Sequence, residues 1–118
     1  MLVVFLFGCA YQTQTIQEVQ TESVQVSLEI HSGEEKIADK VFIVEKGKTG
    51  FDFLKDSIEL KFEEYPFGVF ITDIEGVKAD QTHYWALYIN DSYSEKGIDQ
   101  VILEKDMKIK FVLEEIQS

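Results

Sequence analysis

The chain has 118 residues, 45% of them hydrophobic and 13% aromatic, which allows one domain with a packed core and argues against intrinsic disorder. Its 22 acidic and 11 basic side chains give a formal charge of −11, so nucleic acid and anionic lipid surfaces are excluded as electrostatic partners. A single cysteine excludes an internal disulfide and a cysteine-based zinc site.

The first nine residues, MLVVFLFGC, form an apolar run that ends at Cys9. A run this short cannot span a membrane, which takes about 20 residues in a helix, and it suits the apolar part of a signal peptide. Because LFGC at 6–9 resembles the lipobox of secreted lipoproteins, we expect a lipid on Cys9 that anchors the protein on the outer side of the cell membrane. No basic residue precedes Lys36, so we expect the signal segment to be truncated. The alternative is that 3–7 form a core strand with Cys9 buried beside it.

A tether and a hairpin are predicted next. Residues 10–22 are rich in Gln and Thr and show no hydrophobic period, which indicates a polar tether that leads into a folded domain over 23–118. Apolar and polar residues alternate over 24–30, so we expect a half-buried strand there. A turn at 32–34 and a second strand over 37–44 complete the hairpin.

One short helix follows the hairpin. Thr49 and Asp52 have the three-residue spacing of a capping box, which marks a helix start. Apolar residues then recur with a helical period from Phe51 to Ile58 and predict a helix over 50–58. We expect its apolar stripe to lie on the sheet.

The rest of the chain has the pattern of strands and turns. A hairpin, one helix and then several strands predict an α+β fold of β-grasp type, with a mixed, mostly antiparallel sheet and one short helix packed on it. The remaining predicted strands cover 60–63, 69–74, 84–89 and 107–113, with turns at 65–68, 75–76, 90–91 and 104–106.

Four segments occur in a recognisable order: GKTGFDFLK at 47–55, FEEYPFGVFITDIEGV at 62–77, YWALYIN at 84–90, and KGI at 96–98 followed by EKD at 104–106. Together they resemble the DUF4430 domains, which are relatives of the C-terminal domain of transcobalamin and intrinsic factor. The chain departs from that pattern at Asp91 and Lys105, where glycine is usual. The resemblance implies a β-grasp-like module, which in the vertebrate transport proteins packs over bound cobalamin.

The sequence nominates no catalytic group. His31 and His83 lie in different predicted elements, and the serines near them lack the glycines of a nucleophile elbow, so we expect a protein that is not an enzyme. Oxygen-bearing side chains near the predicted loops offer either a site for a hard metal ion or a solvated acidic rim. Their spacing does not match an EF-hand, so we assign no metal ligand and no resident cofactor. These side chains belong to Asp73, Glu75, Asp80, Asn90, Asp91 and Glu95.

The strand YWALYI is the most aromatic part of the chain. Its alternation places Trp85 and Leu87 toward the core and Tyr84 and Tyr88 on the opposite face. We therefore expect Trp85 to serve packing. The two tyrosines are suited either to stack on a flat ligand or a partner protein, or to cover ordinary surface.

The segment NDSYSEKG at 90–97 is polar and ends in glycine, which is typical of a ligand-facing loop. In the transport relatives, the resemblance places this stretch near the ligand. Asn90 also begins an Asn-Asp-Ser tripeptide, which makes it a candidate for glycosylation. The predicted ligand-binding residues are Tyr84, Tyr88, Asn90, Tyr93 and Gly97.

These features predict an exported, membrane-anchored module that binds a small molecule. The resemblance implies a corrinoid such as cobalamin, or another planar organic molecule, as the ligand. The alternative is a structural or adhesive module that contacts another exported protein by strand addition at a sheet edge, with Lys108 and Lys110 on an exposed edge strand.

Overall fold

The computed structural model describes residues 22–117, so the predicted signal segment, Cys9 and tether residues 10–21 lie outside the described part. The described part contains no helix with the length and apolar character that a membrane crossing requires. Its elements are β1 (Ser23–Ser32), β2 (Glu35–Glu45), α1 (Gly50–Ser57), β3 (Leu60–Tyr65), β4 (Gly68–Ile74), β5 (Val77–Lys78), β6 (His83–Ile89), β7 (Ser92–Tyr93), the 3-10 helix η3 (Ile98–Gln100) and β8 (Met107–Glu115).

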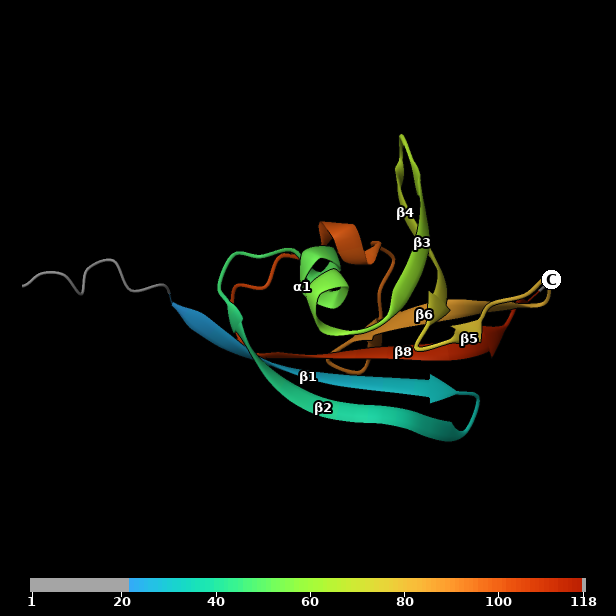
Figure 1. Cartoon of the computed structure of the whole chain (residues 1–118), viewed down its shortest axis with the longest axis horizontal. Coiled ribbons are helices and arrows are strands. Elements are labelled where there is room, and N and C mark those ends of the chain that lie inside the picture. Colours follow the sequence, from blue (N-terminus) through green and yellow to red (C-terminus); the bar gives the residue numbers. More distant parts are fainter. Residues whose placement is uncertain (1–21, 118) are drawn as a thin grey trace, which may run out of the picture.

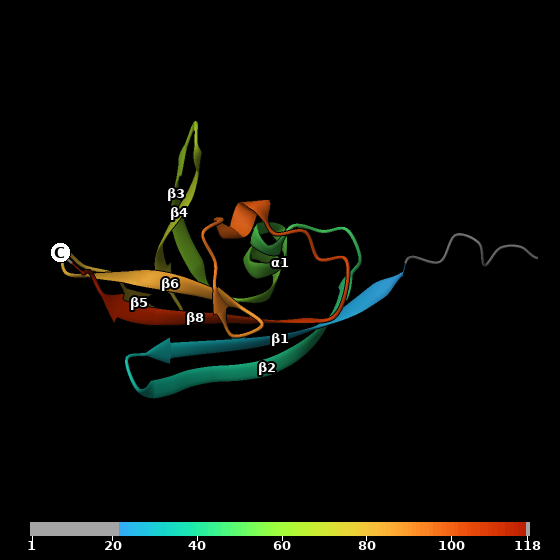
Figure 2. The same cartoon turned by 180° about the vertical axis from the view of Figure 1, so that it is seen from behind.

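Two sheets make up the fold, where the sequence predicted one. The larger sheet has the strand order β2-β1-β8-β6-β7, in which β1 and β8 are parallel and the other neighbours are antiparallel. The smaller sheet is antiparallel with the order β3-β4-β5. Helix α1 covers one face of the larger sheet, which we call the inner face, and β3 and β4 project from that face as an arm (Figures 1 and 2). The α+β class is confirmed.

Local sequence signals account for the first half of the fold. The residues with even numbers from Val24 to Ile30 are buried on the inner face, as their alternation predicted. Thr49 caps α1 by accepting a hydrogen bond from the backbone N–H of Asp52 at 3.1 Å. The helix therefore begins where the capping box predicted, and it ends one residue before the predicted end.

The core lies between α1 and the inner face. Phe53 of α1 meets Phe42 of β2 edge to face, with ring centroids 5.2 Å apart, and Phe51 meets Phe62 of the arm at 4.7 Å. Such ring pairs add to the free energy gained by removing apolar surface from water. The largest fully buried side chains are Phe111, Leu28, Ile30, Leu54, Ile74, Leu103, Ile109 and Val26.

The predicted position of the last strand is wrong. Strand β8 pairs with β1 on one side and with β6 on the other, so Lys108 and Lys110 lie in the middle of the larger sheet. The edge strands of the described sheet are β2 and β7. The parallel pairing of β8 with β1 joins opposite ends of the domain, and no local pattern in the sequence specifies it.

Candidate functional site

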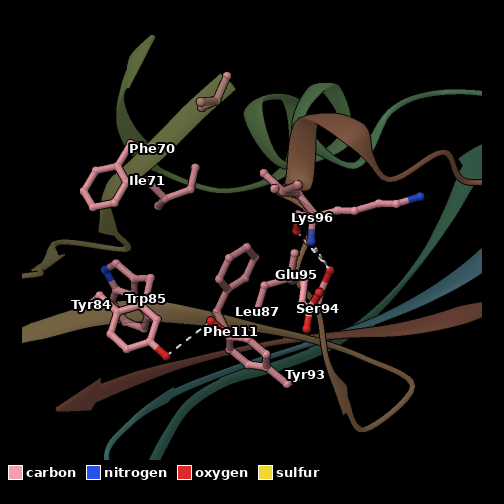
Figure 3. Close-up of a pocket in the computed structure, with 13 residues that line it drawn as sticks. Phe70, Ile71, Tyr84, Trp85, Leu87, Tyr93, Ser94, Glu95, Lys96 and Phe111 are labelled. Atoms are coloured by element: carbon pink, nitrogen blue, oxygen red, sulfur yellow. Dashed lines mark hydrogen bonds between the residues drawn. The ribbon is translucent and has the colours of Figure 1, made fainter. Parts of the chain in front are cut away.

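A cavity of about 340 Å³ opens between the arm, β6 and the segment that leads from β7 to η3 (Figure 3). The arm contributes one wall through Phe70 and Ile71 of β4. The floor comes from Trp85 and Leu87 of β6, with Phe111 of β8 beside them. The cavity therefore lies on the inner face, on the same side of the sheet as α1. Its lining residues are Val69, Phe70, Ile71, Tyr84, Trp85, Leu87, Tyr93, Ser94, Glu95, Lys96, Gly97, Ile98 and Phe111.

The floor of this cavity is part of the hydrophobic core. Trp85 and Leu87 are each 7% exposed, and Phe111 is 2% exposed. Side chains packed this closely hold their rotamers, so the floor is a preformed apolar surface. An occupant would rest on the core itself.

The rim, in contrast, consists of exposed aromatic rings. Phe70 is 52% exposed and Tyr93 is 53% exposed, although both line the cavity. A second hollow of about 220 Å³ adjoins the first and is lined in part by Tyr65 and Phe67 at the end of the arm. The rings of Tyr65 and Phe67 stack with centroids 5.2 Å apart and planes 2° from parallel. The two hollows share Val69, Phe70, Glu95 and Gly97, and we call them together the aromatic groove.

Two tyrosines meet at the sheet edge of the groove. The Tyr84 hydroxyl donates a hydrogen bond to the Tyr93 hydroxyl at 3.5 Å (Figure 3). This hydrogen bond, together with burial, raises the pKa of Tyr84 to about 12. Tyr84 is therefore a neutral hydroxyl at physiological pH.

The structure separates the predicted ligand-binding residues into two groups. Tyr84, Tyr93 and Gly97 line the groove. Tyr88 lies on the outer face, where its hydroxyl donates a hydrogen bond to Glu114. Asn90 occupies a turn with a φ of 51°, and its side-chain oxygen accepts a hydrogen bond from the backbone N–H of Lys108 at 2.8 Å. Tyr88 and Asn90 are absent from the groove lining, although the Tyr88 ring packs edge to face on the lining residue Tyr93, with ring centroids 5.7 Å apart.

Several groove residues were not predicted from the sequence. Phe70 belongs to a β-branched and aromatic run that is equally typical of a core strand. Tyr65 and Phe67 flank Pro66 in a bend, and two aromatic residues in an exposed bend are a signal that could have identified them. Trp85 was predicted as packing only, and it both packs and lines the groove.

The histidines form only local contacts. His83 Nδ1 lies 3.1 Å from Asp80 and 2.9 Å from the Thr82 hydroxyl, within one exposed turn. The backbone N–H of Thr82 and the His83 ring lower the pKa of Asp80 to about 2, so it is ionised at physiological pH. Residues 22–117 contain no group of three or more His, Cys, Asp or Glu side chains that could hold a metal ion.

The groove and its supporting strands fall within a known sequence family. The family model described as "Domain of unknown function (DUF4430)" matches residues 47–115. The chain belongs to the DUF4430 family. The resemblance found in the sequence is therefore confirmed, and the match includes both hollows of the groove. No curated protein matches the sequence.

The solved structures that resemble this DUF4430 protein in fold include the following two. One is haptocorrin in complex with Cbi, with a TM-score of 0.72 and 16% identity over 89% of this chain. The match spans 27% of the haptocorrin chain. The other is a protein from Ruminococcus gnavus ATCC 29149 described as metal binding, with a TM-score of 0.68 and 18% identity over 80% of this chain and 99% of its own. At these identities the likeness shows a shared fold.

Proposed function

We propose that the aromatic groove binds a flat and largely apolar organic molecule, and that the protein binds this ligand without transforming it. The observation that carries the proposal is the gathering of four exposed rings around two joined hollows: Tyr65, Phe67, Phe70 and Tyr93.

Exposed aromatic side chains grouped in this way leave apolar surface in contact with water. A planar ligand would cover them and would rest on the buried floor formed by Trp85, Leu87 and Phe111. Binding sites for small molecules typically combine such apolar walls with a few polar groups, which Tyr84 and Glu95 supply here. The groove therefore has the composition of a ligand site.

A corrinoid is the first ligand class to test. The fold resemblance to haptocorrin in complex with Cbi, a cobalamin analogue, supports this choice. A corrin ring is flat and broad, which suits stacking on Phe70 and on the Tyr65–Phe67 pair. The central parallel pair of β1 and β8 with α1 across the sheet supports the further proposal that the domain is of β-grasp type.

We propose separately where in the cell the protein is located. The apolar run that ends at Cys9 supports export and attachment to the outer side of the cell membrane through a lipid. Metabolic labelling with a fatty acid analogue should mark the native protein and leave a Cys9→Ser variant unmarked. Labelling of both proteins, or of neither, would contradict lipid attachment at Cys9.

Binding can be followed through Trp85, the single tryptophan of the chain. Cyanocobalamin and cobinamide should quench its fluorescence to saturation, and equilibrium dialysis with corrinoid absorbance should give the same Kd. Phe70→Ala should weaken binding by roughly tenfold, as truncating an anchor residue does. Ile43→Ala is the matched control, because Ile43 is 71% exposed on β2 and is absent from the groove lining. The absence of saturable binding for both corrinoids would refute corrinoid binding.

Edge strand β2 favours a second candidate function, a structural or adhesive module. Val41 is 59% exposed and Ile43 is 71% exposed on this strand of eleven residues. A long edge strand with exposed apolar residues is suited to strand addition by another exported protein. Crosslinking on intact cells should then give an adduct that Ile43→Lys abolishes and Phe70→Ala leaves unchanged. The reverse pattern would count against β2.

A further inference from the structure

Two polar atoms in the groove walls have unmet hydrogen-bonding capacity. Among the side chains of residues 22–117, only Trp85 Nε1 and Asp99 Oδ1 are buried without a hydrogen-bond partner. Trp85 lines the first hollow, and Figure 3 shows its ring nitrogen turned toward the side where Phe70 lies. Asp99 lines the second hollow, where Phe70 is again part of the wall. The first hollow therefore has an unpaired hydrogen-bond donor in Trp85, and the second has an unpaired acceptor in Asp99.

Buried polar atoms of folded proteins are nearly always paired, because leaving one unpaired costs free energy of folding. An indole N–H can only donate, and an ionised carboxylate can only accept. The ligand that satisfies both walls must present an acceptor to Trp85 and a donor to Asp99. A primary carboxamide carries both functions in one small planar group.

The charges of the groove oppose an acidic ligand. Glu95 lines both hollows, and Asp99 adds a second carboxylate in one of them. Lys96 is the cation of the lining, and its side chain extends away from the aromatic side chains (Figure 3). The whole chain carries a formal charge of −11, which adds to the repulsion of anions.

We propose that the aromatic groove recognises carboxamide groups and discriminates against the corresponding carboxylates. In this arrangement Trp85 donates its N–H to the amide carbonyl, and Asp99 accepts an N–H from an amide nitrogen. The inference rests on the proposed function, because it assigns a chemical class to the ligand of that same groove. It applies to any planar molecule with amide substituents, of which an amide-bearing corrinoid is one example.

The test uses nicotinamide and nicotinate, which share one flat ring and differ in the amide and the carboxylate. With ¹⁵N-labelled protein, the single tryptophan gives one indole N–H resonance, which reports directly on Trp85. Nicotinamide should move this resonance downfield to saturation, and nicotinate should bind roughly tenfold more weakly. Equal affinities, or an indole resonance that neither compound moves, would overturn the inference.

Two variants separate the donor from the acceptor. Asp99→Asn keeps the size of the side chain and removes its charge, so nicotinate should approach nicotinamide in affinity. Glu104→Gln removes the same charge at an exposed position that is absent from both hollows, and selectivity should stay unchanged. Trp85→Phe keeps an aromatic wall and should weaken nicotinamide binding by roughly three- to tenfold, followed by the Gly97 amide resonance. Unaltered affinity in Trp85→Phe, or equal loss of selectivity in Glu104→Gln, would refute the assigned roles.

The corrinoid titration and the nicotinamide test can each refute one proposal without refuting the other. If corrinoids do not bind while nicotinamide is preferred through Trp85, amide recognition stands and the corrinoid proposal falls. If corrinoids bind with no preference for nicotinamide over nicotinate, the groove binds flat rings and the amide inference alone falls.

Discussion

The two faces of the larger sheet differ in whether their polar side chains have bonding partners. On the outer face Lys108 contacts two carboxylates, with its Nζ 3.0 Å from Asp91 and 3.5 Å from Glu29. Lys110 lies 5.2 Å from the centre of the Tyr88 ring, and the Tyr88 hydroxyl is bonded to Glu114. The polar groups of the outer face are therefore paired with one another. On the inner face, the Trp85 N–H is buried without a partner beside exposed aromatic rings.

This difference separates structural polar groups from groups available to a ligand. Alternation along β6 sends Tyr88 to the outer face, where it joins the network of charges. Tyr84 belongs to the same face by this register and also borders the groove, and its hydroxyl donates a hydrogen bond to Tyr93, whose ring packs on that of Tyr88. Binding is therefore expected on the inner face, and changes on the outer face are expected to affect stability alone.

The largest expected effect comes from the groove floor. Phe111→Ala should lower the free energy of unfolding by about 3–5 kcal/mol, because it leaves a cavity in the core beside Leu87, its neighbour across the paired strands. Phe70→Ala, at an exposed position of the rim, should cost about 1 kcal/mol or less. Urea unfolding at pH 7 measures both, and Phe111→Leu should fall between them. Similar losses for the Ala variants would show that floor and rim are not distinct.

A smaller effect is expected at the turn between β6 and β7. Asn90 and Asp91 have φ values of 51° and 70°, a left-handed pair that suits a two-residue hairpin turn. Asn90→Ala should lower the free energy of unfolding by about 1–2 kcal/mol. Alanine is unfavourable in the left-handed conformation, and it lacks the side-chain oxygen that accepts a hydrogen bond from the backbone N–H of Lys108. Asn90→Gly keeps the conformation and loses only the hydrogen bond, so it should cost about half as much. Urea unfolding tests this order, and corrinoid affinity should remain unchanged in both variants.

The parts of the fold that were predicted correctly depend on local signals. The alternation over 24–30 and the Thr49–Asp52 capping box each act within a few residues, so strand β1 and helix α1 follow from the sequence. The separation of β3 and β4 into an arm depends on long-range packing of Phe62 against Phe51. The central position of β8 likewise depends on pairing with β1, some 80 residues earlier in the chain.

The site was predicted only in part, because local sequence signals identify some of its residues and long-range packing decides the others. The aromatic strand and the loop after it nominated Tyr84, Tyr93 and Gly97, which line the groove. Tyr88 carries the same local signal as Tyr84 and packs on Tyr93, so strand alternation alone could not tell which of the two tyrosines borders the groove. Phe70 could not be assigned, because exposure of a strand residue depends on whether another layer covers it. Asp91, at a position where family members usually have glycine, adopts the left-handed φ that explains that preference.

The smallest expected effect concerns the charges of the outer face in acid. The hydrogen bond from Lys108 lowers the pKa of Asp91, and the pKa of Glu29 is lowered first by His31 and also by Lys108. Carboxyl groups with a lowered pKa in the folded state stabilise it above their ordinary values of 3.8 and 4.5. This stabilisation is lost as the pH falls below those values. Lys108→Met removes the shared cation, so its stability should fall less steeply in acid than that of the native protein.

Urea unfolding from pH 7 to pH 2 measures this effect, and the two curves should converge below about pH 4. Asp80 supplies an internal reference, because its pKa of about 2 arises from Thr82 and His83 and not from Lys108. Its contribution disappears between pH 3.8 and about 2 in both proteins. Lys40→Met is the control, since Lys40 is exposed on β2 and forms no ion pair within residues 22–117. Its curve should run parallel to that of the native protein. A parallel curve for Lys108→Met as well would mean that the outer face is held by pairing of its strands and not by its charges.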